Sequence, residues 1–124
     1  MAEVPVDNTM IGESAKSAQP YILQVFIGAN PEIKDNLSFE RKLYVIRKRA
    51  EKSINQCGLT EGESAYFASL SSRTIVYKGM LTPEQLDQFY LDLKDPTIEI
   101  ALALVHSRFS THTFPSWERA LPLH

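Results

Sequence analysis

The spacing of apolar residues along this 124-residue chain changes several times, and each spacing predicts a different element. Polar and turn-forming residues dominate positions 1–20, which we expect to form an extended or loop lead-in. The stretch "YILQVFIG" at 21–28 is rich in β-forming side chains and predicts a short strand.

A helical spacing begins after Asp35. Apolar residues then recur every three or four positions, which predicts a helix over 37–56. This apolar stripe consists of Phe39, Leu43, Ile46, Ala50 and Ile54. Asp35 or Asn36 is suited to the N-cap position, and Gly58 stands where a left-handed residue commonly ends a helix.

The second half of the chain continues with strand and helix patterns. Two β-rich runs surround a Ser-Ser-Arg turn at 65–80, which predicts a hairpin. A helix over 83–94 follows, because Thr82 is a good cap and both Pro83 and Gln85 occupy favoured positions in the first turn. We expect its buried face to comprise Leu86, Phe89, Tyr90 and Leu93.

The run "EIALALVH" at 99–106 is almost continuously apolar, which is typical of a strand buried on both faces. The full order is therefore strand, helix, two strands, helix, strand. This order predicts an α+β fold in which helices pack on a sheet as separate layers.

Composition narrows the class of protein without giving its function. Hydrophobic residues make up 44% of the chain and the formal net charge is -2, so we expect a single globular domain with little attraction for nucleic acid or membranes. No apolar run approaches the roughly 20 residues that span a bilayer, and the N-terminal residues lack a secretory pattern. A single cysteine favours a reducing compartment, the cytoplasm, or a plastid if the source is photosynthetic.

One face of the predicted helix over 37–56 is basic. A phosphate-binding surface is one interpretation of it, but acidic residues lie nearby and no aromatic residues alternate with the basic ones. We therefore favour a solvated helix face over nucleic-acid binding. The basic residues are Arg41, Lys42, Arg47, Lys48, Arg49 and Lys52.

Nucleophile and metal signals are weak. Cys57 falls at the predicted C-terminal end of a helix, where the helix dipole raises rather than lowers a thiol pKa, so we favour a packing role. The three histidines, His106, His112 and His124, lack the spacing of a metal site. We expect no metal.

Arg108 ends the apolar run and is followed by short hydroxyl side chains. A guanidinium beside a core must be paired, and its fork of donors matches a carboxylate. The residues alone support two interpretations of Arg108 equally. One is a structural ion pair with an acidic side chain, and the other is a pocket for a small carboxylate ligand.

The stretch "HSRFSTHTFPSWERA" at 106–120 closely resembles part of the glutamine amidotransferase domain of glutamate synthase large subunits. The blocks "VPVDN", "QVFIG", "LSFERKLYVIRKRAE" and "YFASLSSRTIVYKGML" resemble further segments of that domain, in the same order. The resemblance extends from about Val4 to Pro122.

This resemblance implies a class II, N-terminal-nucleophile amidotransferase, of which residues 1–124 are an internal segment. It implies part of a four-layer αββα sandwich that hydrolyses L-glutamine. The parent enzyme passes the ammonia to 2-oxoglutarate and carries FMN and an iron–sulfur cluster elsewhere in its chain, with electrons from NADPH or ferredoxin. No cofactor is expected in this segment.

The family's Arg-aromatic-x-Thr motif falls on Arg108, Phe109 and Thr111. By resemblance, these residues bind the substrate, with Arg108 on its α-carboxylate, and this favours the pocket over the structural pair.

The chain departs from the family pattern at both ends. It begins Met-Ala-Glu instead of with the family's nucleophilic cysteine, and it lacks the Asn-Gly pair of the oxyanion hole. We therefore expect no catalytic residue here and no activity from the chain alone. A truncated gene fragment is one explanation. Alternatives are a glutamine- or glutamate-binding module and a fragment that associates with the missing parts of the enzyme.

Overall fold

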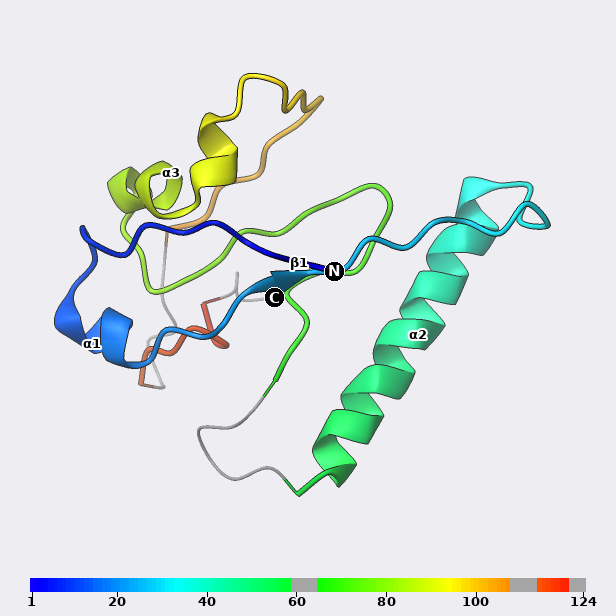
Figure 1. Cartoon of the computed structure of the whole chain (residues 1–124), viewed down its shortest axis with the longest axis horizontal. Coiled ribbons are helices and arrows are strands. Elements are labelled where there is room, and N and C mark those ends of the chain that lie inside the picture. Colours follow the sequence, from blue (N-terminus) through cyan, green and yellow to red (C-terminus); the bar gives the residue numbers. More distant parts are fainter. Residues whose placement is uncertain (59–64, 108–113, 121–124) are drawn as a thin grey trace. The chain divides into compact units, whose positions relative to one another are not determined.

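The computed structural model describes residues 1–58, 65–107 and 114–120. The chain divides into two compact units, Met1–Phe26 with Tyr77–His124, and Ile27–Val76. The described residues contain both helices and a sheet, in agreement with the α+β class (Figure 1).

The sheet of the first unit is small. Strand β1 (Ala2–Glu3) pairs antiparallel with β2 (Leu23–Gln24). The amide of Val4 extends the pairing by donating to the carbonyl of Ile22 at 3.0 Å. The strand predicted over 21–28 is therefore confirmed only at its centre.

The expected lead-in is an integral part of the first unit. Helix α1 (Glu13–Ser17) lies within it, where no helix was predicted, because five residues are too short to show a helical periodicity. Val4, Ile11 and Ala15 are all buried. The N-terminal residues thus supply a large share of this unit's core.

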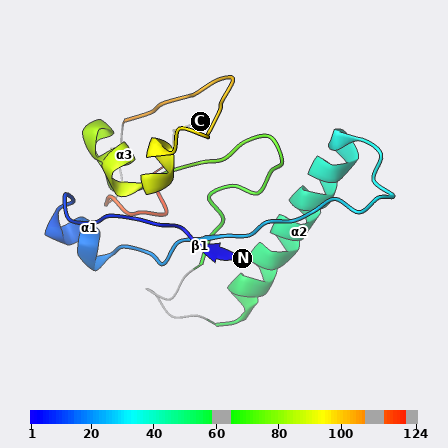
Figure 2. The same cartoon turned by 45° about the horizontal axis from the view of Figure 1, so that its top comes forward.

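The helix predicted over 83–94 is broken at Tyr90. Three short helices replace it: η1 (Pro83–Gln85), α3 (Leu86–Phe89) and η2 (Leu91–Lys94). The backbone of Tyr90 is extended and forms a β-bridge with Val6, while the amide of Asp7 donates to the carbonyl of Phe89 at 2.9 Å. Pairing with the N-terminal segment therefore overrides the local helical preference, and that segment runs between α1 and α3 (Figure 2).

The core of the first unit joins residues from both ends of the chain. Phe89 and Tyr90 are buried as predicted, whereas Leu86 is half-buried and Leu93 is exposed. Among the described residues, the buried members of the cluster are Val4, Ile11, Ala15, Phe89, Tyr90 and Trp117.

Helix α2 (Asn36–Gln56) dominates the second unit and confirms the helix predicted over 37–56. Asp35 caps it, accepting hydrogen bonds from the Ser38 amide at 2.9 Å and the Ser38 hydroxyl at 2.7 Å. Gly58 follows its end with φ of 66°, the left-handed conformation that glycine adopts most easily. Of the predicted stripe, Leu43 is buried, Ile46 is exposed, and Phe39, Ala50 and Ile54 are half-buried.

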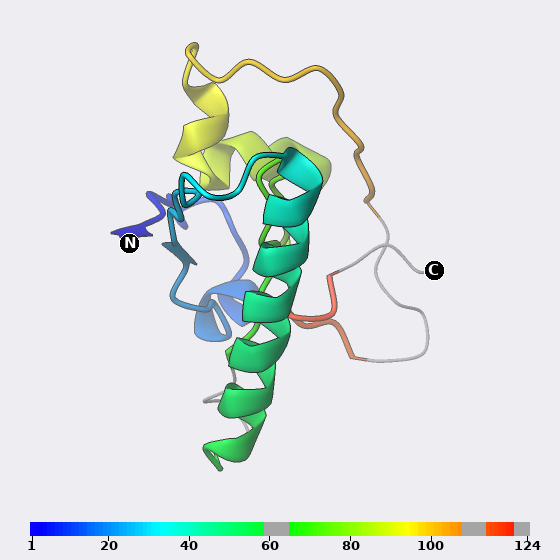
Figure 3. The same ribbon diagram turned by 90° about the vertical axis from the view of Figure 1, so that its right-hand side faces the viewer.

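The strand predictions for two regions are wrong. Residues 65–80 contain no strand, and the segment around Ser71 is instead bonded through side chains to α2. Residues 99–106 form no strand (Figure 3). They are exposed throughout, and Leu104 reaches 93%. A strand requires a hydrogen-bonded neighbour, and the described residues place none beside 99–106.

Candidate functional site

The three candidate substrate-binding residues, Arg108, Phe109 and Thr111, lie outside the described residues. The structure describes both flanks of this segment, 95–107 before it and 114–120 after it. These flanks are fixed to the first unit in different ways.

The upstream flank starts at a tight turn. The Asp95 carboxylate accepts hydrogen bonds from the Thr97 hydroxyl at 2.7 Å and the Thr97 amide at 2.8 Å, and these bonds lower the pKa of Asp95. The amide of Ile98 then donates to the Asp95 carbonyl. Beyond this turn, residues 98–107 are all exposed.

The downstream flank returns to the core through Trp117, which is 3% exposed. Its indole Nε1 donates to the carbonyl of Ala15 at 3.0 Å, and its ring lies 5.2 Å from that of Phe89. Beside it, Lys78 Nζ donates to the carbonyl of Glu118 at 2.6 Å. The turn at 116–119 is therefore held by both apolar and polar contacts.

Gly79 provides the space that Trp117 fills. A Cβ atom on Gly79 would lie 2.5 Å from Cζ3 of the Trp117 ring. The adjacent residue is also fixed, because the Tyr90 hydroxyl donates to the Lys78 carbonyl at 2.7 Å. Because Gly79 has no side chain, its backbone lies close to the Trp117 ring, and the ring packs against the core.

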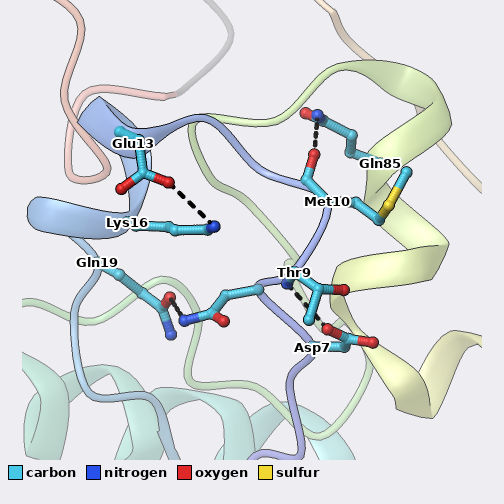
Figure 4. A network of polar contacts seen from close by, with 8 residues as sticks. Asp7, Thr9, Met10, Glu13, Lys16, Gln19 and Gln85 are labelled. Carbon is cyan, nitrogen blue, oxygen red and sulfur yellow. Dashed lines mark hydrogen bonds and ion pairs between the residues drawn. The ribbon is translucent and has the colours of Figure 1, made fainter.

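Exposed polar contacts hold the loop that leads into α1 (Figure 4). Gln85 Nε2 donates to the carbonyl of Met10 at 2.7 Å, and Asp7 Oδ1 accepts from the Thr9 amide at 2.9 Å. Gln85 Oε1 also accepts from the Thr82 amide, which confirms part of the predicted capping box. These side chains bond backbone groups and so hold the loop that precedes α1, the helix whose Ala15 carbonyl accepts the hydrogen bond from Trp117.

The basic residues of α2 include an ion-paired group. Arg47 and Lys48 contact Glu51 at 2.7 and 3.0 Å, which lowers the pKa of that carboxyl. Arg41 and Lys42 border an open hollow of about 310 Å³ together with Val45 and Ile46. This arrangement is compatible with the solvated helix face that the sequence favours.

Other candidate chemistry is sparse in the part of the chain that the structure describes. Cys57 stands at the C-cap of α2, as predicted, but its side chain is exposed, so the packing role that the sequence favoured is wrong. His106 is exposed as well. His112 and His124 lie outside the described residues. Within 1–58, 65–107 and 114–120, no group of three potential ligands could hold a metal ion, and no helix has the length and apolar character that crossing a bilayer requires.

Sequence reasoning did not single out Trp117, Gly79 or Glu40. The signal for Trp117 was available, because it is the only tryptophan of the chain and follows the candidate segment closely. Glu40 accepts hydrogen bonds from the Ser72 amide, the Ser72 hydroxyl and the Ser71 hydroxyl. Its partners lie more than 30 residues away, so no local pattern marks it.

Comparison with known proteins identifies the family. The sequence model of the class-II glutamine amidotransferases matches residues 1–124. The chain belongs to this family. The resemblance found in the sequence is therefore confirmed, and Arg108, Phe109 and Thr111 fall within the matched residues.

Proteins similar to this chain include several glutamate synthases. The chain is 64% identical to the NADPH glutamate synthase large chain of Bacillus subtilis over 119 residues, which is 96% of this chain and 8% of the relative. It is 43% identical over 123 residues to the large chain of Azospirillum brasilense, covering 97% of this chain and 8% of that protein. Ferredoxin-dependent glutamate synthase 1 of Arabidopsis thaliana, chloroplastic/mitochondrial, is 44% identical over 124 residues, covering 98% of this chain and 7% of the relative.

The chain thus spans less than a tenth of the length of these relatives. No solved structure shows a significant match to it.

Proposed function

We propose that this chain is an internal segment of the glutaminase domain of a glutamate synthase. That domain would release ammonia from glutamine for reductive transfer to 2-oxoglutarate, giving glutamate. The observation that carries the proposal is 64% identity to a glutamate synthase large chain across 96% of these residues. The complete domain would form the four-layer αββα sandwich of N-terminal-nucleophile hydrolases, to which these elements contribute.

Arg108, Phe109 and Thr111 are the proposed substrate-binding residues. A guanidinium can hold the α-carboxylate of glutamine through two parallel charge-assisted hydrogen bonds. A threonine hydroxyl can donate a further bond to the same group. Phe109 would pack against the aliphatic part of the ligand.

The chain alone is expected to be inactive. Its one thiol, Cys57, is exposed at the C-cap of a helix and has no α-amine beside it to act as a base. The missing parts of the enzyme would supply the nucleophile and the oxyanion donors. FMN and the iron–sulfur cluster would also lie in those other parts, in the cytoplasm or, in a photosynthetic source, the plastid.

A chimeric enzyme tests this function. Residues 1–124 replace the matched stretch of the Bacillus subtilis large chain, and glutaminase activity is measured against glutamine concentration. We expect the chimera to retain activity. Arg108→Ala should raise KM for glutamine about 10- to 100-fold, because the α-carboxylate of the ligand loses its charged hydrogen-bond donor.

Arg119→Ala is the matched control, since Arg119 is an exposed arginine eleven positions further along the chain. An inactive chimera, or equal effects of the two arginine substitutions, would contradict the proposal. Saturable glutamine binding by the isolated chain, abolished by Arg108→Ala, would support the alternative of a non-catalytic binding module. Ammonia release only after co-expression with the missing parts would support the complementing fragment.

A further inference from the structure

Helix α2 carries an open, almost wholly apolar hollow of about 310 Å³ on its exposed side, where Val45 and Ile46 lie beside Arg41 and Lys42. Two further basic residues follow along the same side, because residues three and four positions apart are neighbours on a helix. Together these side chains form a basic–apolar patch. Its six residues are Arg41, Lys42, Val45, Ile46, Arg49 and Lys52, all exposed.

The four cations of this patch form no ion pair with a described residue. Helix α2 is described in full, and its two acidic side chains are engaged elsewhere. Glu51 pairs with Arg47 and Lys48, and Glu40 accepts hydrogen bonds from residues 71–72. The positive charges of the patch are therefore free to meet carboxylates from another surface.

We propose that the basic–apolar patch is the surface by which this segment docks on an acidic part of the remaining glutamate synthase chain. The inference rests on the proposed function, because it takes the rest of that enzyme as the partner. More than nine tenths of the length of the compared relatives lies outside the matched residues, so a complete enzyme holds enough chain to cover the patch.

The chemistry of the patch defines the partner surface. Two branched aliphatic side chains in the hollow favour an apolar side chain as its occupant. Covering the surrounding cations with an uncharged surface would be unfavourable, since a buried charge needs a partner. Aspartate or glutamate side chains around one apolar residue meet both requirements, and complementary charges also fix how two surfaces align.

Lysine reactivity in the chimeric enzyme tests the docking without relying on activity. Limiting acetylation, quantified by peptide mass spectrometry, compares each lysine in the chimera with the same lysine in the isolated chain. We expect Lys42 and Lys52 to react about tenfold more slowly in the chimera, because a paired amine is held in its protonated, unreactive form. Lys34 is the control, since it is exposed in the same unit but precedes α2, and its rate should be similar in both proteins.

Carbodiimide cross-linking of the chimera identifies the partner surface, because this reagent joins a lysine amine directly to a neighbouring carboxylate. We expect cross-links from Lys42 or Lys52 to aspartate or glutamate residues of the Bacillus subtilis sequence outside positions 1–124. Arg49→Glu should weaken both the cross-links and the protection, because it places a negative charge against acidic groups. Arg119→Glu, an exposed charge reversal in the other unit, is the matched control and should leave both unchanged.

The results separate the docking from the proposed function. If Arg108→Ala raises KM while Lys42 and Lys52 react as fast in the chimera as in the isolated chain, docking is refuted and the proposed function stands. Equal protection of Lys34 would also refute it, because the patch would then not be the surface that is covered. If Arg108→Ala has no effect, the proposed function fails, and this inference fails with it.

Other occupants of the patch give different results with the isolated chain. Protection of Lys42 and Lys52 that grows with the concentration of that chain would assign the patch to a second copy. Protection only after addition of phosphatidylserine vesicles, or of duplex DNA, would assign it to a membrane or to nucleic acid. Each of these outcomes, without protection in the chimera, would overturn the proposal.

Discussion

At the scale of single residues, Gly79 and Trp117 depend on each other. The indole ring can be buried only because position 79 has no side chain, and a Cβ there would approach the ring to 2.5 Å. The neighbouring atoms are themselves held, on one side by the bond from Tyr90 to the Lys78 carbonyl. The strain of a larger residue therefore cannot be relieved by a small shift of the backbone.

Gly79→Ala is expected to destabilise the chain by about 1–3 kcal/mol, because it overpacks the core. For a domain of this size, this corresponds to a fall in melting temperature of several degrees, measured by scanning calorimetry. Gly28→Ala is the matched control, since nothing lies within 4 Å of a Cβ at Gly28. A melting temperature that is unchanged in Gly79→Ala would contradict the packing described here.

Asp35, Trp117 and Arg108 show which features of the fold and of the candidate site a sequence can reveal. The cap at Asp35 was predictable because its partner, Ser38, lies three positions away. The anchor at Trp117 was not, because the carbonyl that it binds belongs to Ala15, 102 residues earlier. The role of Arg108 came from family resemblance alone, since its chemistry fitted two interpretations equally.

At the scale of elements, local signals predicted helix α2 well, located β2 within the strand expected over 21–28, and failed for the strands expected at 65–80 and 99–106. A long periodic stripe, a cap and a terminal glycine all lie within one continuous stretch, so α2 was found to within a residue. The strands expected at 65–80 and 99–106 depend on partners that the described residues do not place beside them. Tyr90 shows the opposite case, where a distant strand-like partner, Val6, interrupts a helix with good local propensity.

Within the second unit, α2 holds the following segment through side chains. Glu40 accepts bonds of 2.6 Å from both the amide and the hydroxyl of Ser72, and one of 2.8 Å from the Ser71 hydroxyl. Seven residues further along α2, Arg47 Nη2 donates to the Phe67 carbonyl at 3.3 Å. These bonds replace the backbone ladder that a hairpin would have provided.

Acid should release this contact. Bonds from Ser72, and then from Ser71, hold the pKa of Glu40 below its ordinary value of 4.5. A carboxyl with a lowered folded-state pKa stabilises the fold above its unfolded pKa, and this stabilisation is lost as the pH falls through the folded value. The amide proton resonance of Ser72 should therefore be constant near neutral pH and shift upfield below pH 4.5.

Glu40→Gln should remove this titration step from the Ser72 resonance. Glu32→Gln, an exposed substitution in the same unit, should leave it in place. A Ser72 resonance that titrates identically in the Glu40→Gln protein would show that another group is responsible.

At the scale of the whole molecule, the most exposed apolar stretch is the one predicted to be the most buried. Leu102 and Leu104 are 80% and 93% exposed, and Ile98, Ile100 and Val105 are exposed as well. The described residues place no strand beside 99–106, and an exposed β-rich apolar segment readily pairs with another chain. The isolated chain should therefore self-associate through residues 98–105.

Replacing Leu102 and Leu104 together by lysine should shift the chain towards the monomer, because charged side chains oppose strand pairing between copies. Sedimentation velocity over a range of concentrations measures the effect. Val45→Lys, which adds a charge at an exposed position of α2, is the control and should leave association unchanged. A monomeric unsubstituted chain at high concentration would contradict the prediction.

The burial of Trp117 also makes the two units optically distinguishable. It is the only tryptophan in the chain, so tryptophan fluorescence, excited selectively over tyrosine, reports the first unit. The far-ultraviolet circular dichroism signal comes mainly from the 21 residues of α2, in the second unit. Denaturation followed by both signals therefore measures whether the units melt together or in succession, without any label or substitution.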